Sequence, residues 1–208
     1  RTDGVTEIRF LANTEDKEKS FAIRGEGFSS AEIWNAENGE TYPADFAVIN
    51  GGAEANIVLP PFGSVIVAFT CENLTPAGKS EERLADITCG WKIAGEDKIA
   101  KRADFFSAGK ENFSGEVTFV KETDIAPQET HGRTILKLED VADYASVSVN
   151  GEFAGARLWA PYTFDLTGKL HAGKNEIAVT IGSTEENAMT GSNKNAGVFG
   201  SIGIFEVK

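Results

Sequence analysis

Apolar and polar residues alternate in short segments along most of the chain. Residues 7–12, 115–121 and 145–149 each show a period of two. This period is typical of a β-strand with one face buried and the other in water. Residues 64–69 are apolar almost throughout, which indicates a strand buried on both faces. The pattern predicts an all-β protein.

Turn signals separate these segments. Three Asn-Gly pairs, Asn38-Gly39, Asn50-Gly51 and Asn150-Gly151, favour two-residue hairpins, because both residues accept the positive φ of a type I′ turn. No segment keeps an apolar period of 3.6 residues, so we expect little helix. One helical turn is expected at residues 81–84.

A linker is predicted between Cys71 and Asp86. This stretch contains Pro76, Gly78 and several charged residues, and few residues suited to a core. A chain of 208 residues holds one large or two smaller domains. We therefore predict two β-sandwich domains, residues 1–78 and residues 79–208.

Composition and charge narrow the range of partners. A net charge of −12 disfavours nucleic acid, whose phosphates bind clusters of Lys and Arg. No apolar stretch approaches the roughly 20 residues needed for a membrane span. The chain starts at Arg1 without a signal-like segment, so we expect a processed or excised piece. The cellular location stays open, with a secreted or cell-surface location favoured.

Cofactor signals are sparse. Cys71 and Cys89 could form a disulfide, although two thiols in a chain of this length are more often free and partly buried. No Cys/His cluster suggests zinc. Glu139, Asp140 and Asp143 could ligate calcium, but their spacing matches no EF-hand loop. We expect no cofactor and leave a structural calcium ion open.

Three motifs in the second half carry a family resemblance. They read VSVNGEFAG at 147–155, WAPYTFDLT at 159–167 and LHAGKNEIAV at 170–179. In this order and spacing they resemble the galactose-binding-like jelly roll of family 2 glycoside hydrolases, and of family 106 α-L-rhamnosidase-like proteins. The segments at 113–119 and 196–204 are similar to the first and last strands of those domains.

The first half shows a weaker resemblance. AEIWNAENGE at 31–40 and LPPFGSVIVAF at 59–69 are similar to segments of the β-domain that follows the catalytic barrel in such enzymes. The resemblance implies a non-catalytic C-terminal segment of a glycoside hydrolase. Such a segment would support an upstream catalytic domain of the same chain and contact carbohydrate. Two alternatives remain, a purely structural spacer and a cell-surface adhesion protein without sugar binding.

Catalysis and sugar binding each require particular side chains. A glycosidase needs two carboxyl groups flanking the scissile bond, and no β/α alternation builds a barrel to hold them, so this fragment is not expected to be an enzyme. Sugar binding needs an aromatic face and polar groups for the hydroxyls. Trp34 and Trp91 are expected in the core or at a domain interface. The predicted carbohydrate-binding residues are Arg157, Trp159, Tyr162, Asn187, Asn193 and Asn195.

Overall fold

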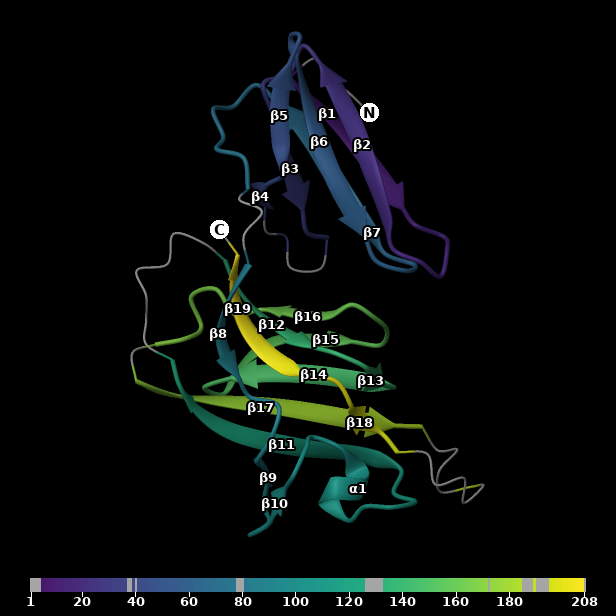
Figure 1. The fold of residues 1–208 in the computed structure, drawn as a ribbon, viewed down its shortest axis with the longest axis vertical. Helices are drawn as coiled ribbons and strands as arrows, with labels where there is room; N and C mark the ends of the chain where they lie inside the picture. Colours follow the sequence, from purple (N-terminus) through teal and green to yellow (C-terminus); the bar gives the residue numbers. More distant parts are fainter. Residues whose placement is uncertain are drawn as a thin grey trace. The chain divides into compact units, whose positions relative to one another are not determined.

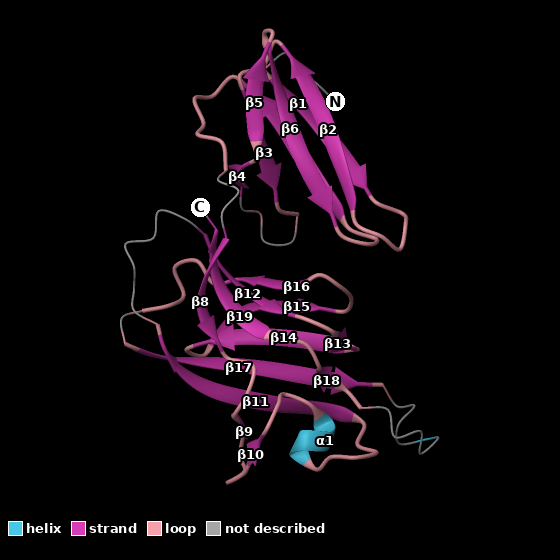
Figure 2. Ribbon diagram, in the orientation of Figure 1, coloured by secondary structure: helices cyan, strands magenta, loops and turns pink. Residues whose placement is uncertain are grey.

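The computed structural model describes residues 5–36, 39, 41–77, 81–125, 133–171, 173–184, 189 and 195–207. Within these residues the protein is all-β, apart from one short helix (Figure 2). The chain folds as two compact units, Arg1–Lys79 and Ser80–Lys208. No helix among the described residues is long and apolar enough to cross a membrane.

The first unit is a sandwich of two antiparallel sheets (Figure 1). One sheet has the order β1-β7-β3-β4 and the other β2-β6-β5. Their inward side chains, Phe28, Ile33, Phe46 and Phe69 among them, form one hydrophobic core. The strands are β1 (Thr6–Ala12), β2 (Lys19–Glu26), β3 (Ser30–Trp34), β4 (Thr41–Pro43), β5 (Phe46–Ile49), β6 (Gly52–Leu59) and β7 (Ser64–Thr70).

The second unit is a larger sandwich. A six-stranded sheet, β10-β9-β11-β17-β14-β15, faces a four-stranded sheet, β16-β12-β19-β8, and the pair β13-β18 lies at one end. The elements are β8 (Glu81–Asp86), β9 (Trp91–Ile93), β10 (Ile99–Ala100), α1 (Phe105–Ala108), β11 (Gly115–Asp124), β12 (Arg133–Leu138), β13 (Val141–Ala142), β14 (Tyr144–Val149), β15 (Glu152–Arg157), β16 (Tyr162–Asp165), β17 (Lys174–Ser183), β18 (Gly197–Val198) and β19 (Ile202–Val207).

Alternation accounts for the core of the second unit. Val117 and Phe119 on β11, and Ile177 and Val179 on β17, are buried at every second position. Trp91 is fully buried in the same core, as the sequence predicts. Two layers whose inward faces are apolar bury both faces at once, which is why the pattern folds as a sandwich.

Two hairpin turns were predicted from Asn-Gly pairs and are present. Asn50 and Asn150 have φ of 48° and 52°, and each is followed by a glycine with positive φ. The Asn150 amide is held firmly: Nδ2 donates to Lys169 O (3.1 Å) and Asn175 Oδ1 (2.9 Å), and Oδ1 accepts from Glu176 N (2.9 Å). Within the described part of the chain the Asn50 side-chain amide has no hydrogen bond, and the backbone oxygen of Asn50 accepts from Arg24 Nη2 (3.0 Å). Asn38 lies outside the described residues.

Two local expectations differ from the structure. The expected helical turn at residues 81–84 is wrong, because this segment is the edge strand β8, paired with β19. That pairing joins segments about 120 residues apart, which local propensity cannot detect. Cys71 and Cys89 are both free, and both are exposed rather than partly buried.

Candidate functional site

A hollow of about 450 Å³ lies at one end of the second unit. It forms where the end of β12 and the turn after it meet the start of β16, because Leu138 pairs with Tyr162 and Lys137 with Thr163. Its volume falls within the range of small-ligand sites. The lining residues are Lys137, Leu138, Glu139, Asp140, Val141, Ala160, Pro161, Tyr162 and Thr163.

Tyr162 is the fixed aromatic wall of the hollow. Its ring is buried, and its hydroxyl donates a hydrogen bond to the backbone oxygen of Asp143. Burial, and secondarily the Asp143 carboxylate, raise the pKa of the Tyr162 hydroxyl. The hydroxyl is therefore a protonated donor that is already used inside the protein, and the ring offers shape rather than acid–base chemistry.

Trp159 lies in the β15–β16 loop, one residue before Ala160, and is not itself among the residues that line the hollow. Its side chain is 66% exposed, and the adjacent Leu158 is exposed as well. An exposed large aromatic side chain offers the kind of apolar face on which sugar rings stack. Trp159 and Tyr162, two predicted site residues, are thus brought to one loop and the strand that follows it.

Arg157 lies at the end of β15, and its side chain makes contacts within the protein. Its guanidinium carbon lies 5.6 Å from the centroid of the buried Phe164 ring, and Nη1 donates to Ala156 O (3.0 Å). A cation over an aromatic face stabilises both side chains. Arg157 therefore anchors β15 against β16, and it does not line the hollow.

The Asn195 side chain forms hydrogen bonds with helix α1 and with the residue that caps it. Its Nδ2 donates to Oδ1 of the buried Asp104 (3.0 Å), and its Oδ1 accepts from Phe106 N (3.1 Å). Asp104 is the N-cap of α1 and also accepts from Ser107 N (2.9 Å). The Asn195 amide thus completes a helix cap. Asn187 and Asn193, the remaining predicted site residues, lie outside the described residues.

Charged side chains at the hollow were not among the predicted carbohydrate-binding residues. Lys137 and Glu139 belong to it because β12 ends there. The alternation of β12 places Lys137 on its outer face, but the sequence does not reveal which strand lies beside it. The sequence leaves open whether Glu139, Asp140 and Asp143 ligate calcium. Among the described residues, no group of three or more His, Cys, Asp or Glu is arranged to hold a metal ion.

Three carboxyl groups have pKa values held low by hydrogen bonds, whereas a glycosidase general acid needs a raised pKa to stay protonated. Hydrogen bonds from Ser201 lower the pKa of Glu139, which lines the hollow. Hydrogen bonds from Thr88 and Thr167 likewise hold the pKa of Asp86 and Asp165 down, the latter against the effect of burial. These groups are acceptors and charge partners.

The outer face of the first unit carries a row of apolar residues, of which Phe10 is exposed and Ile66 and Trp34 are half-buried. Phe10, Ile66 and Trp34 are cross-strand neighbours on β1, β7 and β3, on the face opposite the core. Phe10 is 67% exposed, and Trp34 Nε1 donates to Glu32 Oε1 (2.5 Å). Trp34 is therefore not part of the core of the first unit, and the alternative expectation, a position at a domain interface, stays a prediction.

Comparison with known proteins gives a structural likeness without a sequence likeness. No family model matches the sequence, and no curated protein matches it. A rhamnosidase from Novosphingobium sp. PP1Y matches 99% of this chain with a TM-score of 0.80 and 22% identity. The chain has the fold of a segment of that enzyme. It spans 23% of the rhamnosidase's length.

Two β-glucuronidases match more distantly. The match to the enzyme from Dictyoglomus thermophilum covers 62% of this chain and 28% of the enzyme. Its TM-score is 0.47 and the sequence identity is 14%. The match to the enzyme from Ruminococcus gnavus covers 62% of this chain and 30% of the enzyme. Its TM-score is 0.49 and the sequence identity is 13%. These two likenesses are too low to support a conclusion.

Proposed function

We propose that this chain is a non-catalytic, ancillary segment of a glycoside hydrolase. One observation carries the proposal: both units match one stretch of a much longer rhamnosidase, over 99% of this chain. The sequence motifs of the second unit point to the same class through the galactose-binding-like jelly roll they resemble. In this proposal the segment supports an upstream catalytic domain.

The second unit is proposed to bind carbohydrate in the hollow beside Tyr162. Apolar side chains there, Leu138, Val141 and Pro161, suit the C–H side of a pyranose ring, and the exposed Trp159 indole offers a stacking surface. Backbone and carboxylate oxygens at residues 139–140 can accept hydrogen bonds from sugar hydroxyls. Such sites bind weakly, because a shallow hollow buries little of the ligand.

Titration with simple glycosides tests the binding. Calorimetry and tryptophan fluorescence should both respond at millimolar sugar, and Trp159→Ala should remove most of the response. Phe62→Ala, which truncates an exposed aromatic residue of the first unit, is the matched control and should change nothing. No response to any glycoside by the folded protein would overturn the carbohydrate site. Hydrolysis of aryl glycosides by this chain would overturn its non-catalytic role.

A structural spacer is the second candidate function. The outer row of the exposed Phe10 and the half-buried Ile66 and Trp34 favours it, since a contiguous apolar face commonly marks a protein contact. Co-expression of this chain with the catalytic part of its parent protein tests the idea. Phe10→Ser should weaken the association if this face is the contact, and leave it unchanged if it is not.

A further inference from the structure

Three charged side chains line the hollow, and one of them is already neutralised. Both carboxylate oxygens of Glu81 accept from Lys137 Nζ, at 2.7 and 2.6 Å. The same ammonium lies 5.2 Å from the Phe205 ring centroid. Lys137 therefore directs its charge toward β8 and β19, and Glu81 balances it before any ligand arrives.

The two remaining charges are carboxylates. Glu139 Oε2 accepts from Ser201 Oγ (2.7 Å), which favours its ionised form. The charges of Arg83 and Lys137 add to this effect from a distance, but Arg83 pairs with Asp86 (3.1 Å) and Lys137 pairs with Glu81. Asp140 is exposed at the hollow, and no cation is bonded to its carboxylate within the described part of the chain.

We infer that the hollow selects its sugar by charge, accepting a neutral pyranoside and rejecting the uronate of the same sugar. This inference rests on the proposed carbohydrate binding and specifies its ligand. A uronate at this position would face Glu139 and Asp140, and the cation among the described lining residues, Lys137, is already paired with Glu81. Like charges brought together across an interface oppose binding, and they give specificity more than affinity.

Matched glycosides isolate the effect of the carboxylate. Methyl β-D-glucoside and methyl β-D-glucuronide differ only at C6, as do the corresponding galactosides and galacturonides. In calorimetric titration of the full chain at low salt, each uronide should bind roughly three- to tenfold more weakly than its neutral partner, as expected for two exposed like charges. The difference should shrink at about 0.2 M salt, because exposed charges are screened.

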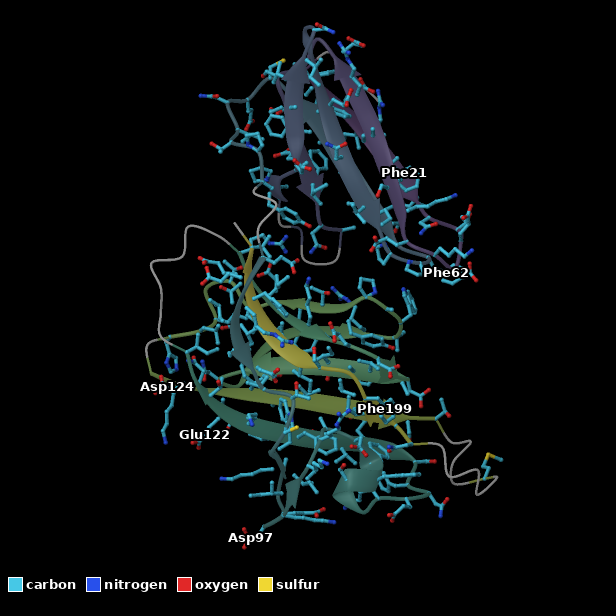
Figure 3. All side chains as sticks on the ribbon, viewed as in Figure 1. Phe21, Phe62, Asp97, Glu122, Asp124 and Phe199 are labelled. Atoms are coloured by element: carbon cyan, nitrogen blue, oxygen red, sulfur yellow. The ribbon has the colours of Figure 1, made fainter. Side chains whose placement is uncertain are left out.

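Charge-removing variants assign the effect to named residues. Asp140→Asn should raise the affinity for the uronide relative to that for the neutral glycoside roughly two- to fivefold, because it removes one of the two like charges. Asn also tolerates the positive φ of Asp140. Asp97→Asn is the control: it removes the same charge at the tip of the β9–β10 turn, far from β16 (Figure 3), and should not change the ratio.

The possible results separate the inference from the function on which it rests. Equal or tighter binding of uronides, with neutral glycosides bound, would overturn the charge selectivity and leave the carbohydrate site standing. Binding of neither kind by the folded protein would overturn the carbohydrate site, and the selectivity with it.

Discussion

Asp165 and Arg133 show how one ion pair ties two neighbouring strands together. Arg133 donates to Asp165 Oδ2 through Nε (3.0 Å) and Nη2 (2.6 Å), and Thr167 N donates to Oδ1 (2.9 Å). Burial opposes ionisation of Asp165, but the hydrogen bonds from Thr167 and Arg133 outweigh it and lower the pKa. Such a pair connects β12 to β16 at the end of the strand pair opposite the hollow.

Asp165→Asn should therefore destabilise the second unit in a pH-dependent way. A carboxyl whose pKa is lower in the folded state contributes stability above its unfolded value of 3.8, and loses it as the pH falls through the folded value. The loss should be about 1–2 kcal/mol at pH 7, allowing for partial solvent exposure, and should shrink as the pH falls below 3.8. Urea unfolding at pH 7 and at low pH, followed by the fluorescence of Trp91, measures the two losses. An equal loss at the two pH values would contradict the mechanism.

Gly197 is the glycine that β18 requires. Its φ is 151°, and a Cβ there would lie 2.4 Å from both Cα and Cβ of Asp104. Gly197→Ala should cost more than about 3 kcal/mol, because the backbone of the neighbouring segment cannot yield cheaply. Gly168→Ala is the control: its φ is also positive, but the space around it is open, so only about 1–2 kcal/mol is expected. Similar losses of melting temperature in both variants would contradict the steric explanation.

Helix α1 depends on a side chain from a segment about 90 residues away, Asn195. Asn195→Ala removes a donor from the buried Asp104 and an acceptor from Phe106 N. We expect a destabilisation of about 1–2 kcal/mol and faster hydrogen exchange in residues 105–108, without a change in glycoside affinity. Weaker glycoside binding at unchanged stability would instead place Asn195 in the sugar site.

At the scale of elements, the sequence predicts what is local and misses what is distant. Alternation correctly predicts strands such as β11 and β14, and Asn-Gly pairs correctly predict the turns at Asn50 and Asn150. The edge strand β8 was missed because its partner β19 is far along the chain. The same limit applies to the hollow: Trp159 and Tyr162 are recognisable as aromatic candidates, but the pairing of β12 with β16 that adds Lys137 and Glu139 is not a sequence property.

For the whole molecule, each unit has a hydrophobic core of its own. A smaller domain buries a smaller fraction of its surface, so the first unit should be the less stable of the two. We expect denaturation in two steps, with Trp91 reporting the later one. Residues 80–208 expressed alone should give the amide spectrum of the second unit in the full chain. A single cooperative transition for both units, or an unfolded fragment, would contradict this independence.

The Asn-Gly turns at Asn50 and Asn150 should deamidate at different rates. Where the side-chain amide is free, the Gly51 nitrogen can attack Cγ of Asn50 and expel ammonia; water then opens the succinimide to aspartate and isoaspartate. The Asn150 amide is restrained by three hydrogen bonds, so the same reaction should be slow at that turn. Peptide mass spectrometry after incubation at mildly alkaline pH should find deamidation at Asn50 well before Asn150, and equal rates would contradict the protection. A stored sample would then carry one extra negative charge and a lengthened backbone at the β5–β6 hairpin, while the second unit stayed chemically intact.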